Sequence, residues 1–175
     1  MQRFSVPVAE LLGQPGAYRD LSICAPLEGV AVDLARLEET PIEAELRAQS
    51  VVEGILVTGR VAGASELRCA RCLKQFSSSL DLEVCELFAV PGHEGLSEDA
   101  YAVAGTEMDL EPMLRDVIAL ALPLHPVCRE ECKGMCAQCG TDLNTGTCEC
   151  TDDDTDPRWA PLDALRAKLE EHSSA

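Results

Sequence analysis

Residues 42–47, Ile-Glu-Ala-Glu-Leu-Arg, decide the fold class, because apolar and charged side chains alternate along them without a break. Strict alternation is the period of a strand with one face buried and the other in water. Residues 55–61 and 80–85 have the same period, and residues 18–24 have a weaker one. Several strands at short spacing predict an antiparallel sheet, either open or curled into a barrel.

The period changes from two residues to that of a helix after residue 100. Apolar residues recur at helical spacing from Leu110 to Ala121, which predicts one long amphipathic helix packed on the sheet. Asp109 stands where an N-cap is expected, Pro112 falls in the first turn, and Pro123 stops the helix. The fold class predicted from these patterns is α+β.

The C-terminal part of the chain carries most of the cysteines and a second helix signal. Residues 127–175 are expected to form a Cys-rich, zinc-ribbon-like segment and a terminal helix that begins at Asp156 and Pro157. We expect an α+β core domain over residues 1–126, with this segment packed on it. At the other end of the chain, residues 6–13 could form one helical turn before a Gly- and Pro-containing stretch.

The composition excludes several classes of function. The chain has 175 residues and a net charge of −17, which argues against binding DNA or RNA through bulk positive charge. The N-terminus lacks the apolar core of a secretory signal, and the longest apolar run, residues 117–124, is far shorter than the roughly 20 residues of a membrane span. We therefore expect a cytoplasmic protein that makes no membrane contact. In a reducing compartment, its 10 cysteines are better suited to binding metal than to forming disulfides.

Eight of the cysteines cluster at spacings typical of structural zinc. Two thiolates separated by two residues can converge on one ion, and a closed site of four has no open position for catalysis. We expect two such ions, both structural. The candidate ligands are Cys69, Cys72, Cys128, Cys132, Cys136, Cys139, Cys148 and Cys150.

The spacing leaves open which cysteines share an ion. In one pairing the last four candidates form a local site, and the first four join the sheet to the segment after the long helix. A rival pairing places Cys128, Cys132, Cys136 and Cys139 on one ion. Cys24 and Cys85 lie outside the clusters and are expected to be buried free thiols.

Basic residues gather around the cysteines in spite of the acidic total. They are Arg68, Arg71, Lys74, Arg129 and Lys133. They could offset the negative charge of the thiolates, or they could form a basic rim that contacts RNA or another partner. A third interpretation, a thioredoxin-type Cys69-x-x-Cys72 pair, lacks the helix start that the motif requires. Nucleophile-elbow, P-loop and dinucleotide motifs are absent from the sequence, so hydrolytic catalysis has little support.

An ordered set of short motifs runs along about residues 50–165. The set comprises Glu53-Gly54-Ile-Leu-Val-Thr-Gly59, Cys69-Ala-Arg-Cys72-Leu73, Asp109-Leu110, Leu120-Ala-Leu-Pro-Leu-His-Pro126, Cys132-Lys-Gly-Met-Cys136-x2-Cys139-Gly140-x-Asp-Leu-Asn144 and Asp156-Pro157-Arg158-Trp159. This set resembles the YceD family. Some members of the family have the first cysteine pair but not the later set. The full later set resembles the Gram-positive form.

The resemblance implies a role in ribosome biogenesis. The family has no established enzymatic activity and is associated with accumulation of 23S ribosomal RNA, and its gene often neighbours that of a small, basic ribosomal protein. Together with the acidic charge, this implies a cytoplasmic assembly factor that holds a basic ribosomal protein or a large-subunit assembly factor. Direct contact with ribosomal RNA through the basic rim is the alternative, and a thiol oxidoreductase is a more distant one.

Overall fold

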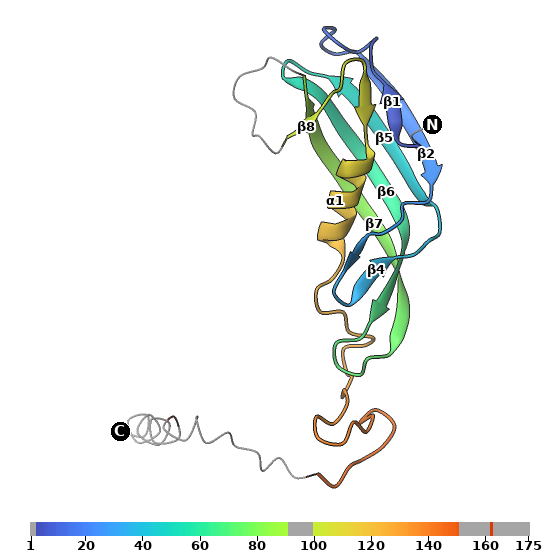
Figure 1. The fold of residues 1–175 in the computed structure, drawn as a ribbon, viewed down its shortest axis with the longest axis vertical. Coiled ribbons are helices and arrows are strands. Elements are labelled where there is room, and N and C mark those ends of the chain that lie inside the picture. The colour runs from blue at the N-terminus through green and yellow to red at the C-terminus, as the bar shows by residue number, and fades with distance from the viewer. Residues whose placement is uncertain (1–2, 91–99, 151–161, 163–175) are drawn as a thin grey trace. The chain divides into compact units, whose positions relative to one another are not determined.

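The computed structural model describes residues 3–90, 100–150 and 162 (Figure 1). The chain divides into two compact units, Met1–Cys132 and Lys133–Ala175. Among the described residues, the strands β1 to β9 and the helix α1, Glu111–Ala121, lie in the first unit. The strands are β1 (Ser5–Pro7), β2 (Tyr18–Ala25), β3 (Ala31–Val32), β4 (Ala35–Leu37), β5 (Ile42–Ser50), β6 (Gly54–Arg68), β7 (Gln75–Ala89), β8 (Tyr101–Ala102) and β9 (Glu107–Asp109).

The long strand β6 organises the main sheet. Along one edge it pairs first with β5 and then with β4, and along the other edge it pairs with β7 from end to end. β2 extends the sheet beyond β5, and β3 extends it beyond β4. These pairs are antiparallel as predicted, whereas the short β7–β8 pair is parallel. β1 and β9 form a separate two-stranded sheet.

The main sheet is open, so the barrel that the sequence allowed does not form. In the described part of the chain, β2 pairs only with β5, and β7 pairs only with β6 and β8. The barrel would require β2 to pair with the strands at the opposite edge. The α+β fold class and the single long helix packed on an antiparallel sheet agree with the prediction.

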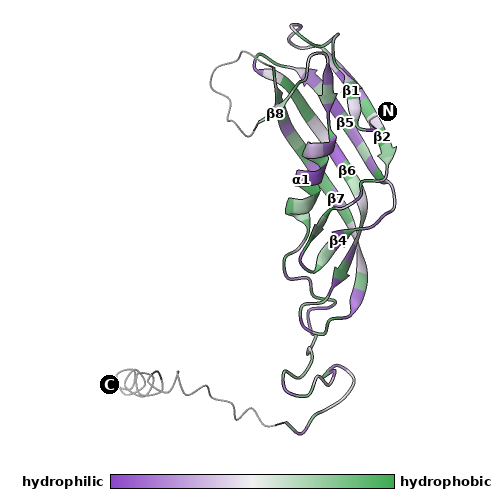
Figure 2. Ribbon diagram, in the orientation of Figure 1, coloured by the Kyte–Doolittle hydropathy of each residue, from purple (hydrophilic) through white to green (hydrophobic). Residues whose placement is uncertain are grey.

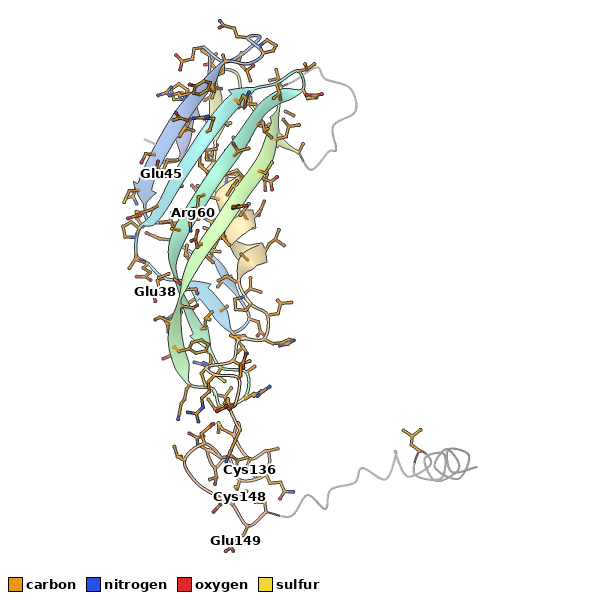
Figure 3. The ribbon with its side chains drawn as sticks, turned by 180° about the vertical axis from the view of Figure 1, so that it is seen from behind. Glu38, Glu45, Arg60, Cys136, Cys148 and Glu149 are labelled. Carbon is orange, nitrogen blue, oxygen red and sulfur yellow. The ribbon has the colours of Figure 1, made fainter. Side chains whose placement is uncertain are left out.

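The alternation in β5 sorts its side chains between two environments. Ile42, Ala44 and Ala48 are fully buried, whereas Glu43 and Glu45 are exposed. Figure 2 shows the same banding of apolar and polar residues along the neighbouring strands. Helix α1 lies across the apolar face, and the core of the first unit is between them (Figure 1). The opposite face, seen in Figure 3, is the uncovered face of the sheet.

Helix α1 places its apolar residues against the sheet. Met113, Leu114 and Ile118 are fully buried. The N-cap residue is Leu110 and not Asp109, but the Asp109 carboxylate still accepts the backbone N–H of Glu111 at 3.0 Å. The acidic side chain therefore caps the helix from one residue further out than expected.

Three other expectations have different outcomes. Residues 6–13 contain the end of β1 and a turn rather than a helical turn, because Val6 pairs with Met108 in the small sheet. Cys24 and Cys85 are exposed, not buried. Both lie in strand positions that point to the uncovered face. The start of the expected terminal helix lies outside the described residues.

Within the described part of the chain, no helix has the length and apolar character needed to cross a membrane.

Candidate metal centres

The first centre begins in the tight loop that joins β6 to β7. The backbone N–H of Cys69 donates to the carbonyl of Lys74, and that of Leu73 donates to the carbonyl of Cys69, both at 2.9 Å. The N–H of Cys72 points at the Cys69 Sγ, 3.5 Å away. Leu73 adopts a φ of 58°, in the left-handed region. The loop thus turns both thiols to the same side.

The other half of this centre comes from the segment that follows α1. The N–H of Ala70 donates to the carbonyl of Pro126 at 2.8 Å. The Arg71 guanidinium donates from Nη1 to the carbonyls of Glu130 and Cys132, each at 3.0 Å. The protein chain itself therefore holds this segment against the β6–β7 loop.

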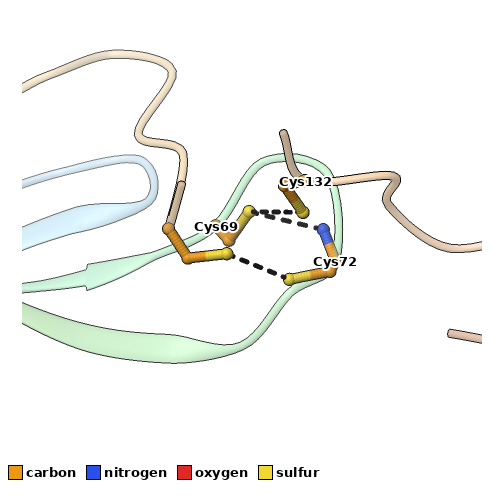
Figure 4. A group of neighbouring side chains, drawn as sticks. Cys69, Cys72 and Cys132 are labelled. Atoms are coloured by element: carbon orange, nitrogen blue, oxygen red, sulfur yellow. Dashed lines mark hydrogen bonds between the residues drawn. The ribbon is translucent and has the colours of Figure 1, made fainter. Parts of the chain in front are cut away.

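Four thiols meet at this junction (Figure 4). The Sγ atoms of Cys69 and Cys132 are 3.8 Å apart, and those of Cys72 and Cys128 are 3.7 Å apart. A tetrahedral ion with metal–sulfur bonds of about 2.3 Å would separate its sulfurs by about 3.8 Å. A disulfide would need about 2.05 Å. The spacing therefore fits a shared metal ion and not a pair of disulfides.

Burial and hydrogen bonding divide the acidity of these thiols unequally. Burial alone would raise the pKa of Cys69. Hydrogen bonds from the backbone N–H groups of Cys128, Cys72 and Arg71 together outweigh burial and lower this pKa to about 6. Burial and the neighbouring sulfurs, that of Cys72 first, raise the pKa of Cys128 to about 12. The Cys69 thiol therefore deprotonates more readily than the Cys128 thiol. A bound cation would favour deprotonation of the other three thiols as well.

The second centre lies entirely in the second unit. The Sγ atoms of Cys136, Cys139, Cys148 and Cys150 lie within 4.8 Å of one another. Its loop repeats the hydrogen bonds of the first: the N–H of Cys136 donates to the carbonyl of Thr141, and that of Gly140 donates to the carbonyl of Cys136, both at 2.9 Å. Figure 3 labels Cys136 and Cys148 side by side.

The second centre is more exposed than the first. Cys139 and Cys150 are exposed, whereas Cys69, Cys72 and Cys132 of the first centre are buried. Hydrogen bonding from Thr141, whose Oγ1 is 3.1 Å from the Cys139 Sγ, lowers the pKa of Cys139 to about 6. The sulfurs of Cys139 and Cys136 raise the pKa of Cys150 to about 12.

Sequence reasoning included Asp142 and Asn144 only as part of the family motif and assigned them no structural role. The Asp142 carboxylate accepts the backbone N–H of Asn144 at 2.9 Å and its side-chain amide at 2.7 Å. The Asn144 Oδ1 then accepts the N–H of Lys133 at 2.9 Å. The signal in the sequence was the polar Asp-x-Asn step directly after the Cys139-Gly140 turn.

The grouping is the first of the two that the spacing allowed. Each group of four could hold one metal ion, and the donor set suits a closed tetrahedral site. In the rival set, Cys128 and Cys132 would share an ion with Cys136 and Cys139. The structure instead places these two pairs in separate groups. Cys69 and Cys72 also meet two further thiols rather than forming an isolated redox pair.

The predicted basic rim divides into residues with different surroundings. Arg71 uses Nη1 to hold the backbone of the first centre. Arg68, Lys74 and Arg129 are exposed in the first unit, and Lys133 is exposed in the second. Arg71 therefore has a structural contact in addition to its place in the rim.

The comparisons with known proteins agree with the motifs. The family described as large ribosomal RNA subunit accumulation protein YceD matches residues 57–166. An uncharacterized protein of Mycobacterium tuberculosis is 38% identical over 90% of this chain and 79% of its own length. A protein of Arabidopsis thaliana, named large ribosomal RNA subunit accumulation protein YCED homolog 1, chloroplastic, is 34% identical over 37% of this chain and 20% of its own length. No solved structure matches. The chain belongs to the YceD family.

Proposed function

We propose that this chain is a non-enzymatic ribosome assembly factor that supports accumulation of 23S ribosomal RNA. It would act in the cytoplasm by binding a basic ribosomal protein or a large-subunit assembly factor. The name of the family supports the connection to the large-subunit RNA. Two zinc ions, one in each four-thiolate group, are proposed as structural cofactors. Four thiolates complete the coordination of zinc, so neither centre would bind a substrate.

The observation that carries the proposal is the charge of the uncovered face of the sheet. Cross-strand register places β2, β5, β6 and β7 side chains on this one face. Carboxylates outnumber guanidinium groups there, and Figure 3 labels Glu45 and Arg60 among them. The carboxylates are Asp20, Glu43, Glu45, Glu66, Asp81 and Glu83, and the guanidinium groups are Arg47, Arg60 and Arg68.

Ion pairs on this face neutralise only part of its negative charge. Arg47 pairs with Asp20 at 2.7 Å, and Arg60 pairs with Asp81. Glu43, Glu45 and Glu83 remain as an excess of exposed carboxylates. Such a surface attracts a protein rich in Lys and Arg and repels the phosphate backbone of RNA.

The experiment that tests the proposal uses immobilised full-length protein and proteins stripped from purified large ribosomal subunits. We expect capture of a basic protein at about 50 mM salt and its loss at about 500 mM, because screening weakens surface electrostatics. The variant carrying Glu43→Lys and Glu83→Lys should lose capture. Glu39→Lys, outside the strands in the β4–β5 connection, is the control. Recovery of protein-free ribosomal RNA instead would contradict the proposal.

One observation supports RNA binding as a second candidate. Arg68, Lys74 and Arg129 are exposed around the first centre. In that case the reversal of Arg68 and Lys74 to Glu abolishes crosslinking to ribosomal RNA, whereas Glu43→Lys leaves it unchanged.

A further inference from the structure

Strand β7 has one edge without a partner along most of its length. It pairs with β6 from Gln75 to Ala89. In the part of the chain that the structure describes, its other edge pairs only with β8, at Phe88 and Ala89. Residues 75–87 therefore present an open edge on the sheet.

Two hydrogen bonds show which residues point their backbone groups outward. The Ala89 carbonyl accepts the N–H of Val103 on the β8 side, so Ala89 faces away from β6. The Lys74 carbonyl accepts the N–H of Cys69, so Lys74 faces β6. Because this direction alternates along a strand, the odd-numbered residues of β7 point their N–H and C=O groups outward. They are Gln75, Ser77, Ser79, Asp81, Glu83, Cys85 and Leu87.

An open edge of this length is a template for pairing with an extended chain. Proteins commonly protect such an edge with proline, with charged side chains, especially lysine, by covering it with a helix or loop, or by keeping the strand short. β7 is 15 residues long and contains no proline and no basic residue. Among the described residues, this edge has no strand partner between Gln75 and Leu87.

The side chains of β7 indicate what the added strand would look like. On the uncovered face, Asp81 and Glu83 are exposed next to the open edge. On the opposite face, Leu80 and Val84 are buried in the core. A strand that alternates basic and apolar residues would match both faces, because opposite charges in neighbouring strands attract.

The same charges disfavour a second copy of this chain as the occupant. Pairing of β7 with another β7 would bring the acidic residues of the two copies onto one short stretch of sheet, and like charges across strands repel. The acidic positions of β7 would attract a basic segment, whereas they would repel the same positions of a second copy.

We propose that the open edge of β7 binds an extended protein segment in which Lys or Arg alternates with apolar residues, by strand addition. This inference rests on the proposed function, since it names the surface that holds the basic partner. The hydrogen bonds come from the outward backbone groups of residues 75–87. The selectivity for a basic segment comes chiefly from Glu83, because Asp81 already pairs with Arg60 of β6.

The test uses the full-length protein and a synthetic nine-residue peptide that alternates Lys with Val. Amide hydrogen exchange should slow at Ser77, Ser79 and Asp81 when the peptide binds. Exchange should change little at Ser78 and Leu80, whose amides already pair with β6. A peptide that alternates Glu with Val is the control ligand and should not bind.

Two pairs of variants separate the backbone contribution from the charge. Ser79→Pro removes one outward N–H and should abolish the protection, whereas Ser79→Ala retains the N–H and should bind normally; proline is tolerated at an edge position whose N–H faces outward. Glu83→Lys should weaken binding about three- to tenfold through cross-strand charge. Glu43→Lys, on the same face but in the interior strand β5, should have a smaller effect.

Several outcomes would overturn the inference. They are no peptide binding, equal binding by the Ser79→Pro variant, a dimer in sedimentation that Ser79→Pro abolishes, or protection by single-stranded RNA instead of the peptide. Peptide binding without capture of any ribosomal protein would contradict the proposed function and leave the edge site intact.

Discussion

At the scale of single residues, the two cysteine loops offer a comparison within one chain. Leu73 and Gly140 follow the second cysteine of their loops and accept the same left-handed backbone, with φ of 58° and 73°. Glycine adopts this conformation freely, whereas a residue with a Cβ is strained by about 1–2 kcal/mol. The Leu73 side chain is 53% exposed, so little packing offsets its strain.

Leu73→Gly should therefore stabilise the first unit, by about 1 kcal/mol. Thermal or urea unfolding of the metal-loaded protein measures this change. Gly140→Ala is the matched reverse change. The added Cβ would meet only the Met135 Cε, at 3.9 Å, so it causes no steric clash. The expected loss of metal affinity at the second centre, about fivefold, therefore comes from backbone strain. A lower stability of Leu73→Gly would show that the exposed leucine contributes packing.

Arg71 is expected to matter for the first centre through its hydrogen bonds to the Glu130 and Cys132 carbonyls. Arg71→Ala removes hydrogen bonds that hold the segment after α1. Metal affinity at this centre should therefore fall about tenfold, which is the effect expected from losing one hydrogen bond with a charged donor. Arg68→Ala is the control, because it removes an exposed charge from the same rim. Chelator competition measures both affinities, and equal effects would contradict the positioning role.

Tyr101 predicts a difference in stability at alkaline pH. Burial, and then its hydrogen bond to Asp116, raise the pKa of its phenol to about 12. The unfolded value is about 10, so the stabilisation is complete below pH of about 10 and is lost as the pH rises towards 12. Tyr101→Phe should lose less stability than the wild type over this range, as followed by thermal unfolding. Parallel curves for the two proteins would contradict the shifted pKa.

At the scale of elements, Gly59 fixes how closely β5 and β6 approach. Its φ is 149°, and an added Cβ would lie 2.1 Å from the Glu45 carbonyl oxygen, a backbone atom that cannot move aside. Gly59→Ala should lower the free energy of unfolding by more than about 2 kcal/mol. Gly63→Ala, in the same strand, would place its Cβ 3.3 Å from the flexible Ile42 side chain and should cost less. Equal losses in denaturant unfolding would contradict this assignment.

The elements that the sequence predicted well are those whose signal is local. β5 has perfect alternation and was predicted from Ile42 to Arg47, although the strand continues to Ser50, and the apolar spacing of α1 placed it correctly. The turn at residues 6–13 was misread because Val6 belongs to β1, whose partner Met108 is about a hundred residues away. Pairing over that separation leaves no periodic mark on either segment.

The sequence indicated eight candidate ligands, and the structure arranges these cysteines in two groups of four. Spacing identified the eight cysteines, yet two pairings remained open because distant pairs can meet only through the fold. The segment after α1 determined the outcome, since Pro126 accepts the Ala70 N–H and brings Cys128 and Cys132 to the β6–β7 loop. Cys24 and Cys85 were misplaced because cysteine is usually buried, whereas their strand positions face outward.

At the scale of the whole molecule, the two centres have different consequences for stability. The first joins the end of the sheet to the segment after α1 within one unit, so removing its ion should destabilise the α+β unit itself. The second has ligands only between Cys136 and Cys150, so removing its ion should alter that loop alone. In unfolding experiments, Cys72→Ser should therefore lower the melting temperature of the main transition, whereas Cys139→Ser should leave it nearly unchanged. Equal shifts would contradict the separation of the centres.

The central claim is that the chain holds two independent four-thiolate metal centres, and metal content per chain tests it most directly. Purified protein should contain two equivalents of zinc, and Cys72→Ser and Cys139→Ser should each contain one. These substitutions affect one group each, and the groups share no ligand. A single equivalent in the wild type, or loss of both ions in either variant, would contradict the account.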